Sequence, residues 1–165
     1  MKTMMLAVAG VLALGMPYQA EALDLLSTNG TGPVGNCQAA LPTYEGRIRK
    51  RPLAVVNESD TNAYVTCALM SEEVSLNVQS FSTRLSNGSD VSVTISCTAV
   101  VGDELATASY IPKSLTLAPG TAGNLTWTGA DAGGLLTSKS IALSCNLPPF
   151  TALNRNRVTT LLSLI

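Results

Sequence analysis

The chain has 165 residues, of which 46% are hydrophobic, 13% charged and 4% aromatic, and its formal net charge is −1. Phosphate binding needs an excess of clustered cations, so this charge balance argues against nucleic acid as a partner. The sequence contains no histidine, which excludes Ser-His-Asp and Cys-His nucleophilic sites and removes the usual general base near neutral pH.

The first 22 residues have the pattern of a secretory signal peptide. Lys2 precedes an apolar run over residues 4–14, residues 15–17 break that run, and Ala20-Glu21-Ala22 places small residues at the two positions that a signal peptidase reads. An apolar run of about 11 residues is too short to cross a hydrocarbon core of about 30 Å. We therefore expect cleavage after Ala22 and a mature chain that is secreted or periplasmic, without a transmembrane anchor.

Beyond the cleavage point the chain is typical of short strands separated by polar turns. Residues 23–36 are rich in Asn, Gly, Ser and Thr and offer little to bury, so we expect a flexible N-terminal lead-in there. Residues 91–100 carry the clearest strand signal, because apolar side chains alternate with Ser and Thr without a break. The predicted strands cover residues 47–56, 63–70, 74–78, 91–100, 108–111, 113–117, 124–128, 140–147 and 157–165.

About eight or nine short strands, with turn signals roughly every 8–12 residues, predict one all-β domain over residues 37–165. The favoured architecture is an antiparallel β-sandwich of the immunoglobulin-like or Greek-key type. The alternative is an up-and-down β-barrel, which strand spacing does not distinguish from a sandwich. Pro52 cannot donate a ladder hydrogen bond, which places the strand over residues 47–56 at an edge or a bulge. For the same reason, Pro112 is expected to stop the strand over residues 108–111.

Four cysteines in an exported chain of this size, Cys37, Cys67, Cys97 and Cys145, indicate two disulfides. No two of them are close in sequence, and without histidine a structural zinc site is not expected. Cys97 and Cys145 each follow an alternating series of apolar residues, so we favour a bond between these two on core strands. That choice leaves Cys37 to pair with Cys67. Because Cys67 is also in phase with its apolar neighbours, a Cys67–Cys97 bond is a serious rival.

Five short motifs are spread over most of the mature chain: Cys37-Gln-Ala-Ala-Leu-Pro, Ile48-Arg-Lys-Arg-Pro-Leu-Ala, Asn57-Glu58, Asn62-Ala-Tyr-Val-Thr-Cys67 and Ser144-Cys-Asn-Leu-Pro-Pro149. Together they resemble uncharacterised exported bacterial proteins of about this length. The resemblance implies a small, disulfide-bonded, secreted β domain. It implies no activity and no catalytic or binding residues.

The ionisable residues do not form the pattern of an enzyme. Carboxylates that could serve in acid–base chemistry lie almost entirely in turn-like segments: Glu45, Glu58, Asp60, Asp90, Asp103, Glu104 and Asp131. Solvated turn carboxylates and Asx-type caps explain such positions. Lys113 and Lys139 lack a Ser-x-x-Lys context, and residues 129–134 lack the Lys-Ser/Thr ending of a phosphate-binding loop. We therefore expect no enzymatic activity, no cofactor and no metal.

The most unusual charge feature is the basic run formed by Arg47, Arg49, Lys50 and Arg51. On a strand, alternate members of this run share a face and would offer a contact for an anion or a partner. Arg155 and Arg157 would join them if the last strand paired nearby. The competing interpretation is an edge strand whose cations prevent edge-to-edge aggregation, and the adjacent proline favours it.

Two classes of function are consistent with these observations. The first is a secreted or periplasmic, non-enzymatic structural or interaction module whose partner is a cell-surface protein. An adhesin or pilus-like subunit is a special case of it. The second is a module that binds a glycan or a small anion. Stacking on sugars needs exposed aromatic side chains, and Trp127, which alternates with Leu125, is expected in the core instead.

Overall fold

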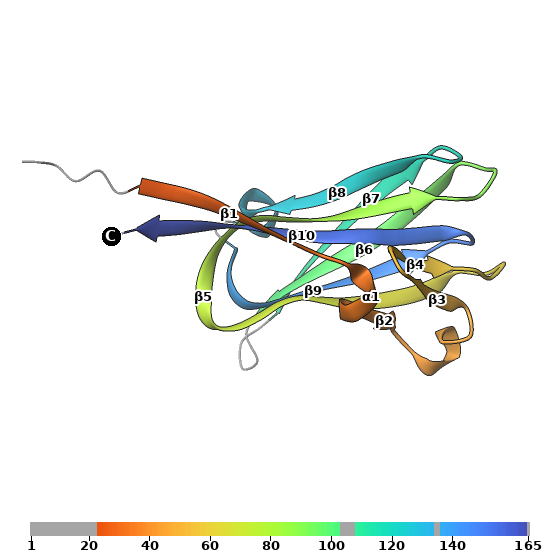
Figure 1. The fold of residues 1–165 in the computed structure, drawn as a ribbon, viewed down its shortest axis with the longest axis horizontal. Helices are drawn as coiled ribbons and strands as arrows, with labels where there is room; N and C mark the ends of the chain where they lie inside the picture. The colour runs from red at the N-terminus through yellow and green to blue at the C-terminus, as the bar shows by residue number, and fades with distance from the viewer. Residues whose placement is uncertain (1–22, 103–107, 134–135, 165) are drawn as a thin grey trace, which may run out of the picture.

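The computed structural model describes residues 23–102, 108–133 and 136–164, so the segment predicted to be a signal peptide lies outside the described residues. Its elements in chain order are β1 (Leu23–Thr31), α1 (Pro33–Asn36), β2 (Cys37–Ala39), η1 (Pro42–Tyr44), β3 (Ile48–Arg51), β4 (Ala54–Asn57), β5 (Ala63–Asn87), β6 (Val93–Gly102), β7 (Ser109–Leu117), β8 (Ala122–Thr128), η2 (Gly129–Ala132), β9 (Leu136–Leu147) and β10 (Thr151–Leu164). Figure 1 shows the start of β1 and the end of β10 at the same end of the molecule.

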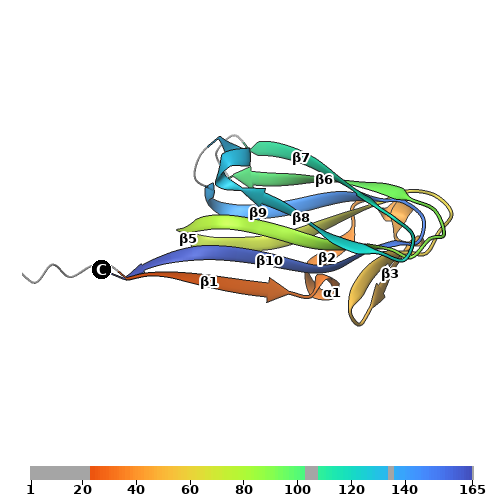
Figure 2. The ribbon, with the colours of Figure 1, turned by 90° about the horizontal axis from the view of Figure 1, so that it is seen from above.

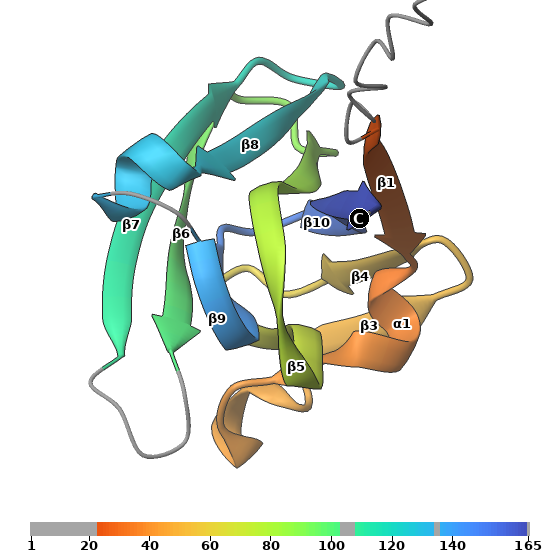
Figure 3. The ribbon, with the colours of Figure 1, turned by 90° about the vertical axis from the view of Figure 1, so that its left-hand side faces the viewer.

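The strands form two antiparallel sheets that pack face to face, so the predicted β-sandwich is confirmed rather than the barrel (Figure 2). Sheet I contains β2, the first part of β5, β9, β6 and β7. Sheet II contains β3, β4, β10, the second part of β5 and β8, with β1 on the same edge of β10 as β4. Seen end on, β6, β7 and β9 lie on one side, β10, β4 and β1 on the other, and β5 between them (Figure 3).

The longest strand, β5, joins the two sheets. Its 25 residues pair with β9 over the first part and with β8 and β10 over the second. The pairing with β9 shifts register between Ser71 and Leu76, where the strand passes from one sheet to the other. The two separate strands predicted over residues 63–70 and 74–78 are therefore one bent strand.

Two prolines act differently from expectation. The strand predicted over residues 47–56 is a hairpin, because Arg51 pairs with Ala54 and leaves Pro52 and Leu53 as its turn. Pro112 does not stop a strand but lies within β7, opposite Thr98. β7 is the last strand of sheet I, and an edge strand tolerates a residue without an N–H because one side of it has no ladder to complete.

Residues 23–36, which sequence composition placed outside the domain, contain β1 and α1. All nine residues of β1 pair with β10, from Leu23 opposite Leu164 to Thr31 opposite Asn156. Leu26 is nevertheless 62% exposed. Main-chain pairing with the edge of β10 therefore holds this segment, a contact that hydrophobic periodicity could not reveal.

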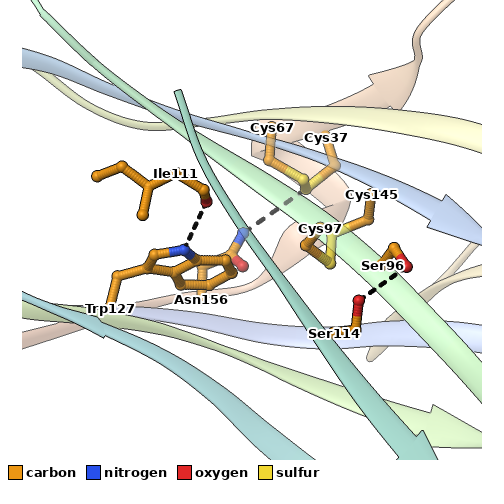
Figure 4. Close-up of a disulfide and its surroundings, with 9 residues drawn as sticks. All are labelled: Cys37, Cys67, Ser96, Cys97, Ile111, Ser114, Trp127, Cys145 and Asn156. Carbon is orange, nitrogen blue, oxygen red and sulfur yellow. Dashed lines mark hydrogen bonds between the residues drawn. A yellow bond between two sulfur atoms is a disulfide. The ribbon is translucent and has the colours of Figure 1, made fainter. Parts of the chain in front are cut away.

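The core is built from the inward-facing half of each strand, as alternation predicts. Trp127 is fully buried, as expected, and stacks on Phe81, with ring centroids 5.2 Å apart. These two residues are direct neighbours on β8 and β5. The indole N–H donates to the carbonyl oxygen of Ile111 over 2.9 Å (Figure 4), which ties β8 of sheet II to β7 of sheet I.

Disulfides join Cys37 to Cys67 and Cys97 to Cys145, the pairs that strand phase favoured. In both bonds the two cysteines lie directly opposite each other on neighbouring strands of sheet I. Each bond therefore crosslinks one sheet instead of passing between the two sheets. The Asn156 side chain of sheet II approaches the first bond, with Nδ2 3.6 Å from Cys37 Sγ (Figure 4).

A buried asparagine organises the loop after β4. Asn57 is 0% exposed, and its Nδ2 donates over 2.8 Å to the carbonyl oxygen of Thr61 within the loop and over 2.8 Å to that of Leu147 on β9. Its Oδ1 accepts from both the N–H and the hydroxyl of Ser59. One side chain therefore shapes the turn and anchors it to the adjacent sheet.

The loop after β5 repeats this arrangement. Asn87 Nδ2 donates to the carbonyl oxygens of Val91 (2.7 Å) and Leu117 (3.1 Å). Its Oδ1 accepts from the N–H and from the hydroxyl of Ser89. Both loops read Asn-x-Ser-Asp, and in each a disulfide-bonded cysteine follows the asparagine at the same spacing. The backbone of Phe150 connects the two loops. Its N–H donates to the carbonyl oxygen of Asn57, and its carbonyl oxygen accepts from the N–H of Gly88.

Candidate functional site

The basic run singled out from the sequence lies on β3, which is an edge strand. Arg49, Lys50 and Arg51 are exposed, and β3 pairs only with β4. Arg51 forms an ion pair with Glu58. The Arg47 guanidinium stands 5.5 Å from the centre of the Tyr44 ring and donates to the carbonyl oxygen of Asn62. Arg47 and Arg51, two of the four cations of the basic run, therefore interact with other residues of the chain. The edge position of β3 fits the interpretation that these cations prevent edge-to-edge aggregation.

Arg155 and Arg157 do not join this run. They project from the outer face of sheet II, where Arg155 lies directly opposite Arg84 and Arg157 opposite Ser82. Asn124 of β8 lies on the other side of Arg84. These five residues line a hollow of about 30 Å³. We call Arg84, Arg155 and Arg157 the arginine cluster.

Sequence analysis missed Arg84, because the cluster depends on how β5 pairs with β10. Alternation alone places Arg84 on the face opposite to the buried Thr83 and Leu85. Only the register, which includes a shift between Leu153 and Arg155, brings it beside Arg155. A one-residue change of register would move the whole set of side chains to the other face.

A larger groove lies on sheet I, where β2 ends. β2 is three residues long and pairs with β5 only as far as Cys67, because the chain before Cys37 turns into α1. The space that this leaves measures about 470 Å³. Its lining residues come from α1, β2, β5 and β9: Gly35, Asn36, Gln38, Thr66, Cys67, Ala68, Leu69 and Ala142. We call this the sheet I groove.

The lining of the sheet I groove combines apolar surface with a few polar side chains and contains no charged residue. Asn36, Gln38 and Thr66 contribute two amides and a hydroxyl, and hydrogen bonds from these side chains to other parts of the described chain are absent. Ala68 and Ala142 lie opposite each other on β5 and β9 and give the groove small apolar walls. Amides can both donate and accept, so the groove offers free hydrogen-bonding groups next to apolar surface.

An exposed tyrosine lies beside the groove. Tyr64 shares a face of β5 with Thr66 and Ala68, since residues two apart on a strand point the same way, and it is 43% exposed. Its ring centroid lies 5.8 Å from that of Tyr44, and the Arg47 guanidinium lies over the Tyr44 ring. This chain of contacts restrains the Tyr64 ring, which lies on β5 two residues before the lining residue Thr66. Alternation along the strand does not distinguish Tyr64 from the other aromatic residues.

Among the carboxylates that the structure describes, Asp131 has the most altered proton affinity. Lys113 on β7 donates to it over 2.7 Å, and both the N–H and the hydroxyl of Thr128 donate to its other oxygen. Hydrogen bonding from Lys113 and the Thr128 N–H lowers the pKa of Asp131 from 3.8 to about 2. Lys113 also donates to the carbonyl oxygen of Thr126, so this polar cluster fastens β7 to β8.

This pKa predicts how stability depends on pH. Because the folded-state pKa of Asp131 lies below its unfolded value, ionised Asp131 contributes stability above about pH 4, and the contribution is lost as the pH falls through about 2. We expect Asp131→Asn to lower the free energy of unfolding at pH 7 and to make little difference at pH 2. Urea unfolding of both proteins at the two pH values measures this. An equal loss at both would show that charge is not the cause.

Within residues 23–102, 108–133 and 136–164, groups of three or more His, Cys, Asp or Glu side chains that could hold a metal ion are absent. Within the same residues, the helices are too short and too polar to cross a membrane. Glu58 and Asp131 are each paired with a cation, and Asp103 and Glu104 lie outside the described residues. Two disulfides are typical of proteins in an oxidising, extracellular compartment.

Neither a protein-family model nor a curated protein matches the chain. Among solved structures, the chain is similar to the C-terminal CBM6 of LamC, a marine laminarinase from Zobellia galactanivorans, with 9% identity over 81% of this chain and 99% of that one and a TM-score of 0.46. It is also similar to TmCBM61 in complex with β-1,4-galactotriose (10% identity, 83% and 88% of the chains, TM-score 0.37) and to a pilus protein of Bacillus endospore appendages (9%, 96% and 100%, 0.37). Likeness at this level extends to the sandwich architecture alone.

Proposed function

We propose that the protein is an exported, non-enzymatic binding module that holds a neutral glycan in the sheet I groove, against Tyr64. The observation that carries this proposal is the combination of an open groove of about 470 Å³ with uncharged hydrogen-bonding groups and an exposed, positioned tyrosine. Ligand sites generally pair an apolar surface with a few convergent polar groups in a space of about 300–1,000 Å³.

The chemistry of the groove suits a sugar ring. Each sugar hydroxyl both donates and accepts, and so do the amides of Asn36 and Gln38 and the hydroxyl of Thr66. The C–H face of a pyranose is apolar and packs on an aromatic ring such as Tyr64. The absence of charged side chains from the groove lining favours neutral sugars over acidic ones, because an acidic sugar would lose hydration without gaining a cation.

Export and the absence of catalysis are supported by separate features. The signal-like first 22 residues and the two crosslinks fit a protein that folds outside the cytoplasm. The side chains at the groove are amides, a hydroxyl and small apolar groups, none of which exchanges protons near neutral pH. A neutral glycan would therefore be bound without being cleaved.

A glycan array followed by calorimetry tests the proposal. We expect the purified protein to select neutral glycans, and we expect Tyr64→Ala and Gln38→Ala each to weaken binding about tenfold, the effect of losing roughly 1.4 kcal/mol. Tyr110→Ala is the matched control, because Tyr110 is 71% exposed on β7 of the same sheet, a strand that β6 and β9 separate from β5. Unchanged binding by both groove variants, or binding of no neutral glycan at all, would contradict the proposal.

A further inference from the structure

We propose that the arginine cluster is a binding site for a tetrahedral oxyanion, namely the phosphate or sulfate group of a monoester. The site lies on the outer face of sheet II and shares no residue with the sheet I groove. It is formed by Arg84, Arg155 and Arg157, with Asn124 and Ser82 completing the hollow between them.

The first argument is that the positive charges of the arginine cluster lie close together and are not neutralised by carboxylates of the described residues. Arg84 and Arg155 lie directly opposite each other on β5 and β10, where Cβ atoms are about 4.5–5.5 Å apart and like charges destabilise the pairing. Arg157 follows on the same face of β10, about 6.6 Å further along the strand. In the described part of the chain, the ion pairs are those of Arg51 with Glu58 and of Lys113 with Asp131. Within these residues, the three arginines of the cluster therefore have no carboxylate partner. A bound anion would turn this repulsion into attraction.

The second argument is that neutral donors face the same hollow. Asn124 flanks Arg84 from β8, and Ser82 lies opposite Arg157. Within the described residues, neither side chain is hydrogen-bonded to another. The hollow of about 30 Å³ is large enough for one or two water-sized groups. It therefore fits a single charged head group and excludes a whole sugar ring.

The number of donors identifies the kind of anion. Three guanidinium groups, an amide and a hydroxyl approach one small space from three strands. One guanidinium can saturate the two oxygens of a carboxylate through a planar, two-bond contact. A phosphate or sulfate monoester presents three free oxygens in three directions, which matches donors arriving from three strands. The site therefore favours tetrahedral anions over carboxylates.

Binding measurements with defined probes test this site. The probes are dextran sulfate, uncharged dextran, polygalacturonate, vesicles of phosphatidylcholine with phosphatidic acid, and inorganic phosphate. We expect binding to dextran sulfate or to the phosphatidic acid vesicles, with weaker binding to polygalacturonate. The comparison of the first two shows whether the ester belongs to a polysaccharide or to a lipid, and inorganic phosphate should compete in either case. Any binding of uncharged dextran belongs to the sheet I groove and should be the same in Arg84→Gln.

Matched variants distinguish specific binding at the arginine cluster from non-specific electrostatic attraction. Arg84→Gln and Arg155→Gln should each weaken binding at least tenfold, whereas Arg49→Gln, which removes the same charge from exposed β3, should change it less than twofold. Inorganic phosphate should raise the melting temperature of the unaltered protein but not that of Arg84→Gln. Equal loss in the Arg49 variant, tighter binding to polygalacturonate than to dextran sulfate, or no binding to any anionic probe would each overturn the proposal.

Discussion

Replacing Trp127 with alanine is expected to lower the free energy of unfolding by about 3–5 kcal/mol, the range for deleting a large buried aromatic side chain. Trp127 is 0% exposed, so its removal leaves a cavity that the two sheets cannot fully close. The substitution also deletes the stack on Phe81 and the hydrogen bond to the carbonyl oxygen of Ile111. Urea unfolding followed by circular dichroism measures the loss.

Two further variants show where this loss comes from. Trp127→Phe keeps an aromatic ring against Phe81 and removes the N–H donor, so we expect a smaller loss than with alanine. Tyr110→Ala changes an aromatic residue that is 71% exposed, and its effect should lie within about 0.5 kcal/mol of zero. A loss below about 1 kcal/mol for Trp127→Ala would contradict its place in the core.

Replacing Asn87 with alanine is expected to cost about 1–3 kcal/mol, the penalty for leaving a buried hydrogen-bonding group without its partner. Asn87 is 2% exposed, and its Nδ2 is the donor to the buried carbonyl oxygen of Leu117. Asn57→Ala should cost a similar amount, because Asn57 makes the equivalent bond to Leu147. Chemical denaturation of the two variants gives both values.

The matched control for these asparagines is Asn62→Ala, since Asn62 is exposed and should change the free energy of unfolding by less than about 0.5 kcal/mol. Asn87→Asp keeps an oxygen that can accept from Ser89 but loses the Nδ2 donor, so it should be no more stable than the alanine variant. If Asn87→Ala were neutral, or if the two alanine variants differed by several kcal/mol, the two loops would not be equivalent.

Much of the fold follows from alternation along single strands. The buried series around Ile95, Cys97 and Ala99 is the one that residues 91–100 predicted, and the buried position of Trp127 was read from its phase with Leu125. Strand phase also favoured the two disulfide pairs, but Cys67 shares that phase, and the register of β2 on β5 and of β6 on β9 is what excludes a Cys67–Cys97 bond. Local periodicity was enough wherever a strand packs one face against the core.

What alternation could not predict depends on contacts between distant parts of the chain. β1 is held by the free edge of β10, and its apolar residues are confined to its first four positions. Pro112 is tolerated because β7 lies at an edge, a fact that only the strand order provides. The arginine cluster needs the register of β5 against β10, and the sheet I groove exists because β2 is short. Strand order and register are properties of the assembled sheets.

One missed feature did have a sequence signal. The two Asn-x-Ser-Asp segments that begin at Asn57 and Asn87 precede Cys67 and Cys97 at the same spacing. This repeat marks the two loops in which a buried asparagine bonds to the adjacent sheet. Asparagine and serine in turns are so common that the repeat becomes meaningful only when both loops show the same hydrogen bonds.

The most direct test of the account is an NMR titration of the isotope-labelled protein with the neutral oligosaccharide that a glycan array selects. The account predicts that the amide shifts of Gln38, Thr66 and Ala68 move together on binding, while those of Arg84 and Arg155 on sheet II stay in place. Shift changes confined to sheet II or to the loops at the ends of the sandwich, or no change at saturating oligosaccharide, would contradict it.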